Sequence, residues 1–293
     1  KIVLLCGHYY PDTVGGTEAY VQTLGQNLRE RGHDITVAAP TTEDSRRSYT
    51  HGGLPVFRYP VSPNPSRAEL RRQEAPQHLD AWSDWLQQTH PDVVHMHSLT
   101  RGCSVYHAES VTHLDIPLFV TVHVPGVTCP RGTMMRWGTT PCDGEIRPVR
   151  CGACVMQDRG LPRPLAWATS AVSTTGIGRG LTGAPGTALQ RAPLIQRRKE
   201  RLQAWIERAE HVVVVAGWLK EVLRRNGISQ EHVTVSRHGL SASMRATQRE
   251  AARRRPAHDP AAPLRIGFVG RFTEVKGPHV LVETEFQLQK SVE

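Results

Sequence analysis

Short apolar runs alternate with helix-length segments through the first 125 residues, and this alternation constrains the fold more than any other feature. The apolar runs that we expect to form strands are residues 2–6, 35–39, 54–59, 93–97 and 118–122. Between two of them, residues 17–31 repeat apolar side chains at helical spacing and stop at Gly32. Strands that alternate with helices favour a parallel sheet covered on both faces. The sequence therefore predicts an α/β fold.

The alternation is interrupted once and then resumes. Residues 67–89 are predicted to form one long surface helix, and residues 105–114 another helix. Residues 124–193, which hold four of the six cysteines and many glycines and prolines, form an insertion in this pattern. After it we expect helices and strands at residues 194–208, 211–215, 218–226 and 233–235. We therefore predict an N-terminal Rossmann-like domain over residues 1–240, a linker over 241–263, and the first strand and helix of a second Rossmann-like domain over 264–293.

The length and the apolar pattern limit the kind of protein. A chain of 293 residues forms one large domain or two ordinary ones. No run of 18 apolar residues is present, so we expect no membrane-spanning helix. The apolar start at residues 2–6 is too short for a signal peptide and is better explained as a first strand. Without an export signal or evident cysteine pairing, a cytoplasmic protein is expected.

The positive charge is concentrated in one region. The net charge is +9, while residues 161–256 alone contain 17 Lys and Arg against 6 Asp and Glu. Such a region favours phosphate-bearing partners or a peripheral contact with an anionic membrane on its inner face, with the amphipathic residues 194–208 as the candidate contact. A solvated basic surface explains the charge equally well, and packing of the same helix on its own sheet explains its apolar side. The arginines are not interleaved with aromatic residues, so no nucleic acid is expected.

A phosphate-binding segment is predicted near the end of the chain. Residues 264–269 have the pattern of a buried strand, and Gly270, Arg271, Lys276 and Gly277 follow it in a turn. Backbone N–H groups at such a turn point outward, and the two cations add fixed positive charge. A solvated loop is the alternative explanation of these residues.

Several short motifs follow one another along the chain in a specific order and spacing. These are Tyr10-Pro11, Gly15-Gly16-Thr17-Glu18, Pro91-Asp92-Val93-Val94-His95-Met96-His97, Thr121-Val122-His123, residues 209–216 with Trp218-Leu219, Gly239, Gly270-Arg271 and Lys276-Gly277. With these motifs and with its elements in this order, the chain resembles the retaining glycosyltransferases of family 4, whose two-domain architecture is called GT-B. The resemblance covers nearly the whole chain and depends on the motifs together.

The resemblance implies roles for individual residues. Gly15 and Gly16 would lie against the phosphates or the sugar of the donor, although a plain strand-to-helix turn also explains them. His123 would be the catalytic residue that faces the transferred sugar. Arg271 and Lys276 would bind the donor pyrophosphate. His95 and His97 alternate along one strand and are interpreted as structural. Val124-Pro125 departs from the family, in which Asp and an aromatic residue often follow this histidine.

Four cysteines form a separate group in the insertion. Cys129, Cys142, Cys151 and Cys154 follow the spacing C-x12-C-x8-C-x2-C, and the last pair has the spacing of zinc ligands. A structural zinc site, four reduced thiols without metal, and a disulfide are the three alternatives. The neighbouring Cys-Pro-Arg-Gly segment at 129–132 resembles a cysteine-bearing insertion found in a subset of these glycosyltransferases. Cys6 and Cys103 are expected to be core residues.

The resemblance implies transfer of a hexose-type sugar from a UDP- or GDP-linked donor to an acceptor hydroxyl, with retention and without a catalytic metal. A glycan or a lipid-linked acceptor in polysaccharide, glycolipid or cell-envelope glycan synthesis is expected. The family's glutamate pair in the second domain would lie beyond residue 293. A second hypothesis is therefore an inactive truncated fragment that binds at most an acceptor or a membrane. A sugar-nucleotide epimerase with the GT-B architecture is a third hypothesis, and the Gly-Gly-Thr-Glu and Cys-Pro-Arg-Gly segments favour the glycosyltransferase over it.

Overall fold

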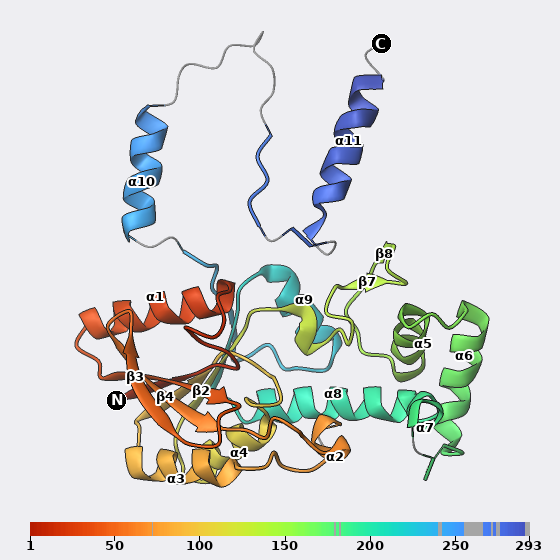
Figure 1. Ribbon diagram of the computed structural model, residues 1–293, viewed down its shortest axis with the longest axis horizontal. Coiled ribbons are helices and arrows are strands. Elements are labelled where there is room, and N and C mark those ends of the chain that lie inside the picture. The colour runs from red at the N-terminus through yellow and green to blue at the C-terminus, as the bar shows by residue number, and fades with distance from the viewer. Residues whose placement is uncertain are drawn as a thin grey trace. The chain divides into compact units, whose positions relative to one another are not determined.

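The structure is a computed structural model that describes residues 1–71, 73–178, 180–181, 183–239, 242–254, 266–270, 272–273 and 276–290 (Figure 1). The chain divides into two compact units, Lys1–Gly239 and Leu240–Glu293. The first unit contains the eight-stranded sheet and the helices that cover its two faces. The predicted domain limits stay a prediction.

One eight-stranded sheet organises the first unit. Its strands, in spatial order, are β10 (Val233–Val235), β9 (His211–Val214), β6 (Leu118–Val122), β5 (Val93–Met96), β1 (Ile2–Leu5), β2 (Ile35–Thr41), β4 (Leu54–Pro60) and β3 (Arg47–His51). Every neighbouring pair is parallel except β3 and β4, which form an antiparallel edge. The predicted α/β fold with a parallel sheet is confirmed.

Helices of the first unit follow the strands as the sequence pattern predicts, with additional short ones in the insertion. They are α1 (Gly16–Glu30), α2 (Arg67–Leu70), α3 (Leu79–Thr89), α4 (Val105–Thr112), α5 (Pro148–Asp158), α6 (Arg163–Val172), α7 (Gly183–Ala188), α8 (Arg191–Glu207) and α9 (Gly217–Arg225), with 3₁₀ turns η1 (Pro125–Val127) and η2 (Ser173–Thr175) and the hairpin β7 (Met135–Arg136) and β8 (Thr140–Pro141). The second unit contains α10 (Ala242–Arg253) and α11 (Pro278–Lys290). No helix in the described parts of the chain combines the length and the apolar character needed to cross a bilayer.

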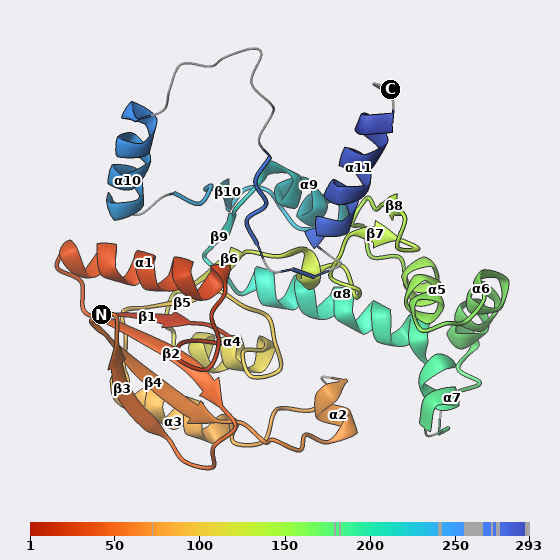
Figure 2. The ribbon, with the colours of Figure 1, turned by 45° about the horizontal axis from the view of Figure 1, so that its top comes forward.

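Both faces of the sheet are covered, which explains the continuous apolar runs of its central strands. In β1, Val3 and Leu5 pack into one core with α3, α4 and α8, whereas Leu4 and Cys6 pack on the opposite face against α1. Figures 1 and 2 show α1 on one face of the sheet and α3, α4 and α8 on the other. Successive residues of a strand point to opposite faces, so a strand buried on both sides is apolar throughout.

The structure corrects one predicted element of the first unit and shows regular structure within its insertion. Residues 67–89 form two helices, α2 and α3, because Pro76 lies between them and a proline in a helix interior removes a hydrogen bond and clashes with the preceding turn. In the insertion, the described part of residues 168–186 contains the end of α6, the turn η2 and part of α7. There, hydroxyls of Ser170, Ser173 and Thr174 bond to backbone carbonyls and help to order the segment.

Two further differences concern the second unit. Residues 242–253, predicted as linker, form α10, because their Ala, Arg, Gln and Glu residues favour a helix. Residues 266–269, predicted as part of a buried strand, lie in no strand, and Ile266 and Val269 are exposed. A strand needs a neighbour to receive its backbone hydrogen bonds, and the described part of this unit contains none.

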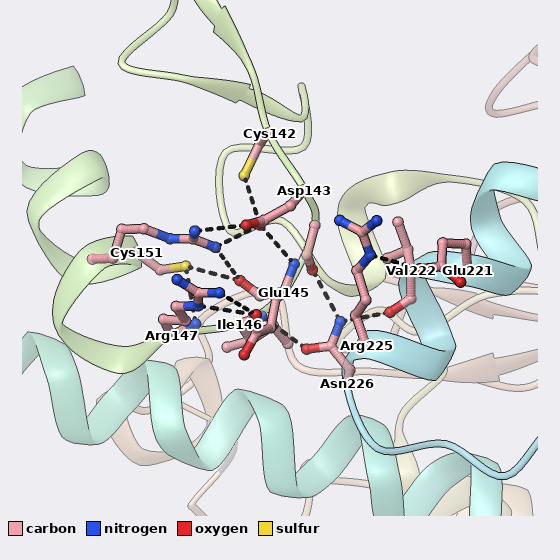
Figure 3. A network of polar contacts seen from close by, with 12 residues as sticks. Cys142, Asp143, Glu145, Ile146, Arg147, Cys151, Glu221, Val222, Arg225 and Asn226 are labelled. Carbon is pink, nitrogen blue, oxygen red and sulfur yellow. Dashed lines mark hydrogen bonds and ion pairs between the residues drawn. The ribbon is translucent and has the colours of Figure 1, made fainter.

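Asn226, at the end of α9, joins the cysteine-rich insertion to the sheet domain. Its side-chain oxygen accepts the N–H of Ile146 at 2.8 Å, and its amide donates to the carbonyls of Gly144 at 2.9 Å and Val222 at 2.8 Å (Figure 3). The side chain is completely buried. One amide therefore satisfies three backbone groups, two of them in a loop 80 residues earlier in the chain.

Replacing Asn226 by Ala leaves these three buried backbone groups without partners. We expect Asn226→Ala to lower the free energy of unfolding by about 3 kcal/mol, measured by urea denaturation. The matched control is Asn27→Ala on the exposed side of α1, where the amide donates only to the carbonyl of Thr23. That change should cost less than about 0.5 kcal/mol. Equal losses in the two variants would contradict the role given to Asn226.

Candidate functional site

The carboxyl ends of β1 and β5 mark the place where the strand order reverses. From β1 the chain builds outward through β2 and β4, and then returns to β5 on the other side of β1. Open parallel sheets bind ligands in the crevice outside such a reversal. The loops that follow these two strands meet there, since a Cβ on Gly7 would lie 2.7 Å from the side chain of Thr100.

A cavity of about 470 Å³ opens at this edge. It is lined by hydroxyl, carboxylate and guanidinium groups, among them Asp12, Thr13, Thr42, Glu43, Arg58 and Arg101. Groups of these types form hydrogen bonds with hydroxyl-rich or anionic molecules. The cavity lies entirely within the first unit, and the sequence analysis did not identify it.

Arg58 is the buried charge that shapes this cavity. It lies on β4 with 1% of its side chain exposed and pairs with Asp12 at 2.8 Å. Its guanidinium also donates to the carbonyls of Tyr9 at 2.8 Å, Pro40 at 2.9 Å and Tyr10 at 3.0 Å. These bonds satisfy a charge that would be costly to bury alone. The only sequence signal was an arginine in the middle of an apolar strand.

The loop from β1 to α1 carries the predicted Gly15 and Gly16. A Cβ on Gly15 would meet the carboxylate of Glu18 at 2.6 Å, so the glycine makes room for that buried side chain. The hydroxyl of Thr13 also donates to Glu18 at 3.4 Å. No atom lies within 4 Å of the place where a Cβ on Gly16 would be, which leaves its backbone open to a ligand.

His123 directly follows β6 and lies in a cluster of aromatic rings. Its Nε2 lies 3.2 Å from Nδ1 of His97, and its Nδ1 lies 3.3 Å from Nε2 of His238. The ring of Tyr20 on α1 packs against His123 with a centroid distance of 4.8 Å and against His238 at the same distance. Residues from β5, β6, α1 and the segment after β10 therefore meet at one point on the sheet edge.

Burial keeps His123 and the neighbouring His95 and His97 neutral. Burial, with smaller contributions from His238 and His95, lowers the pKa of His123 to about 3. Burial also lowers the pKa of His97 well below its ordinary value and that of His95 to about 4. Each nitrogen–nitrogen contact needs one shared proton, so the three rings His97, His123 and His238 must adopt matching tautomers. Both nitrogens of His123 are then engaged, and a substrate hydroxyl would have to replace one of its partners.

These contacts show how the neighbouring histidines relate to His123. The sequence analysis interpreted His97 as structural; it is buried, with 2% exposed, and it also contacts His123 directly. His95 bonds to Thr121 at 2.8 Å and keeps a purely internal contact. His238 was missed, because a single histidine before a glycine gives no signal until the fold brings it to the end of β6.

The other predicted site residues are only partly described. Arg271 lies outside the described residues. Lys276 is exposed, its N–H bonds to the carbonyl of Thr273 at 2.9 Å, and Gly277 follows it with a φ of 71° before α11 begins. The predicted roles of Gly15, Gly16, His123, Arg271 and Lys276 stay predictions.

The four cysteines of the insertion surround one small cavity. Its volume is about 30 Å³, and its lining includes Cys129, Cys142, Cys151 and Cys154. All four are free thiols. Within the described residues, no three or more His, Cys, Asp or Glu side chains are already arranged as metal ligands. Backbone N–H groups of Trp137 and Arg147 point at two of the sulfurs, each at 3.4 Å, and burial raises the pKa of Cys151.

A parallel α/β sheet with its ligand-binding edge at a chain reversal defines a Rossmann-like domain. Residues 14–143 match the model of the family described as Glycosyltransferase Family 4. This match confirms the predicted resemblance to glycosyltransferase family 4 over these residues, and the predicted α/β fold class with a mostly parallel sheet is confirmed.

Individual proteins are similar to the chain over limited parts. An uncharacterized 42.6 kDa protein in the cps region of Klebsiella pneumoniae is 36% identical over 62 residues, which are 21% of this chain and 17% of that protein. Anabaena HepE, solved with UDP and glucose, is 14% identical with a TM-score of 0.49, over 98% of this chain and 57% of its own. Sucrose-phosphate synthase from Thermosynechococcus elongatus is also 14% identical, with a TM-score of 0.47, over 85% and 52%. The chain thus spans less than two thirds of the length of each of these proteins.

The neutrality of His123 can be measured directly. We expect its ring nitrogens to keep the chemical shifts of a neutral tautomer at pH 5, because its pKa of about 3 lies below that pH. In urea, where the cluster is lost, the same ring should titrate near 6.5. Nitrogen-15 NMR of the imidazoles, assigned with His123→Gln, reads both states. A protonated His123 at pH 5 in the folded protein would contradict the buried cluster.

Proposed function

We propose that this chain contributes the acceptor-side domain of a glycosyltransferase that moves a sugar from a nucleoside diphosphate sugar to an acceptor hydroxyl. The observation that carries the proposal is that His123 and the polar cavity both lie at the carboxyl edge of one parallel sheet, in a chain whose residues 14–143 match the family 4 model. His123 would face the sugar, and the cavity beside Arg58 would hold the acceptor. Gly15, Gly16, Arg271 and Lys276 would bind the donor phosphates.

Neutral His123 is suited to one task in this reaction. An uncharged imidazole donates one hydrogen bond, and both ring nitrogens of His123 already contact neighbouring histidines, His97 and His238. We infer that a sugar hydroxyl takes the place of His238, which is exposed, whereas His97 is buried and stays in contact. Transfer with retention, a hexose donor linked to UDP or GDP, and a catalytic step without metal belong to the same proposal. The pathway proposed is polysaccharide, glycolipid or cell-envelope glycan synthesis in the cytoplasm.

A second candidate function is binding without transfer. The cavity beside Arg58 lies wholly within the first unit and would recognise an acceptor with no donor present. Acceptor binding without release of nucleoside diphosphate would favour this function over the first. The predicted membrane contact also stays a proposal, and α8 is a poor candidate for it. The apolar residues of that helix, including Leu202, Trp205 and Ile206, lie in the core.

His123 should be required for transfer. We expect His123→Ala to lower the rate of nucleoside diphosphate release by about 10²–10³-fold, because it removes a positioned hydrogen-bond donor at the sugar. The assay offers UDP- and GDP-linked sugars with glycan acceptors. His33→Ala, a change at an exposed turn after α1, is the matched control and should leave the rate unchanged. Equal rates in wild type and His123→Ala would contradict the proposed role.

We further propose that the four insertion cysteines hold one structural zinc ion. Their convergence on a single small cavity supports this, and binding would require the sulfurs to turn toward its centre. Purified protein should carry about one zinc per chain, and Cys151→Ser should lose it. Cys103→Ser, at a buried thiol outside the insertion, should retain it. Protein purified without metal would contradict the zinc site. Four reactive thiols in the insertion would then indicate reduced cysteines, and two would indicate a disulfide.

A further inference from the structure

The polar cavity beside Arg58 is lined by a cation that its carboxylates do not use. The charged groups of the lining are the carboxylates of Asp12 and Glu43 and the guanidinium groups of Arg58 and Arg101. Asp12 pairs with Arg58 at 2.8 Å. Arg47 on β3 pairs with both carboxylates, with Glu43 at 3.1 Å and with Asp12 at 3.6 Å. Both negative charges of the lining are therefore compensated by cations other than Arg101.

Arg58 itself is not available to a ligand. Its Nε donates to the hydroxyl of Tyr49 at 3.1 Å. Its two terminal nitrogens donate to the carbonyls of Tyr9, Tyr10 and Pro40. Only 1% of the side chain is exposed. Because its donors are used inside the fold, Arg58 supports the wall of the cavity and does not bind the contents.

Arg101 keeps its donors free at the same cavity. It is half-buried on the bend after β5, and among the described residues its side chain forms no salt bridge and no hydrogen bond. Glu69 and Glu74 line a second, much smaller cavity together with Arg101. Their carboxylates accept hydrogen bonds elsewhere, Glu69 from the N–H groups of Ser66 and Gln77 at 2.8 Å each, and Glu74 from the hydroxyl of Ser66. A partly buried guanidinium in this state favours an anion.

The backbone on each side of Arg101 is held in place. Before it, the N–H of Thr100 donates to the carbonyl of Cys103 at 2.8 Å, which closes the bend. After it, the carbonyl of Gly102 accepts the hydroxyl of Tyr59, a buried residue of β4, at 2.5 Å. A fixed backbone lowers the entropy that a side chain on it loses on binding. Arg101 is therefore mounted at the cavity in the way that a recognition residue requires.

We propose that Arg101 determines acceptor specificity by binding an oxyanion, either a carboxylate or a phosphate ester, an inference that rests on the proposed function of the cavity as the acceptor site. The fork of N–H donors on a guanidinium matches two oxygens of either group at once. A neutral sugar in the same place leaves the charge of Arg101 partly desolvated and uncompensated, so it binds more weakly. Acceptors of the same shape are thus distinguished by their charge.

Three matched methyl glycosides test this recognition without any transfer. They share one glucose ring and carry at C6 a hydroxymethyl group, a carboxylate or a phosphate ester. Titration of nitrogen-15-labelled protein, followed by NMR, gives a Kd for each. We expect at least one anionic probe to bind about tenfold more tightly than the neutral one, and about 0.5 M NaCl to remove most of this preference. The tighter anionic probe identifies the kind of oxyanion. Equal binding of all three, or no binding of either anionic probe, would overturn the proposal.

Variants of Arg101 locate the contact. Arg101→Ala should weaken binding of the preferred anionic probe about tenfold and leave the neutral probe within about twofold. Arg101→Lys keeps the charge without the fork and should retain part of the preference. The matched control is Arg31→Ala, because Arg31 ends α1 at the opposite edge of the sheet and donates to the carbonyl of Asn27. Circular dichroism checks that each variant is folded. A loss in Arg101→Ala that is the same for all three probes would contradict recognition of charge.

Transfer assays separate this inference from the proposed function. With the preferred anionic probe as acceptor, Arg101→Ala should raise the KM about tenfold and change kcat less than about twofold, because a contact kept in the ground and transition states affects binding alone. An unchanged KM would count against Arg101. No release of nucleoside diphosphate with any probe would contradict the proposed function instead, and the charge preference measured by NMR would then still decide whether Arg101 binds an oxyanion.

Discussion

The ion pair between the buried guanidinium of Arg58 and the half-exposed carboxylate of Asp12 is the interaction on which the ligand-binding edge depends. A guanidinium inside a sheet is tolerated only when every donor finds an acceptor. Here the acceptors include the carbonyls of Tyr9, Tyr10 and Pro40. Because Arg58 needs these acceptors, its hydrogen bonds fix the course of the loop after β1. That loop leads directly to Gly15 and Gly16 and forms one wall of the cavity.

A second constraint acts on the other side of β1. His97, His123 and His238 bond in a row, and burial keeps the first two uncharged. Rings whose nitrogens share a proton must have matching tautomers, so a ligand that replaces His238 would also select the tautomers of His123 and His97. The row of contacts therefore connects exposed His238 to buried His97 through His123, the candidate catalytic residue.

The sequence predicted the sheet well and the site less completely. Apolar runs identified seven of the eight strands of the main sheet, because burial on both faces leaves a continuous apolar run. They missed the edge strand β3, whose residues are polar and only partly buried. The apolar pattern also failed at residues 67–89, where one proline divides a helical pattern, and at residues 266–269, where an apolar run has no neighbouring strand. Motif order identified the family and the position of His123. The cavity, Arg58 and His238 gave no comparable signal, since each depends on segments distant in the chain.

The sequence by itself determined the α/β class, the resemblance of residues 14–143 to family 4, and the concentration of positive charge after residue 160. These follow from local composition and spacing. Only the tertiary structure decided which apolar side chains remain outside. Leu202 and Trp205 on α8 have the same chemistry as Leu165 and Trp167 on α6, yet the first pair is buried and the second exposed. Burial depends on which neighbours a helix face meets, and that is a property of the folded chain.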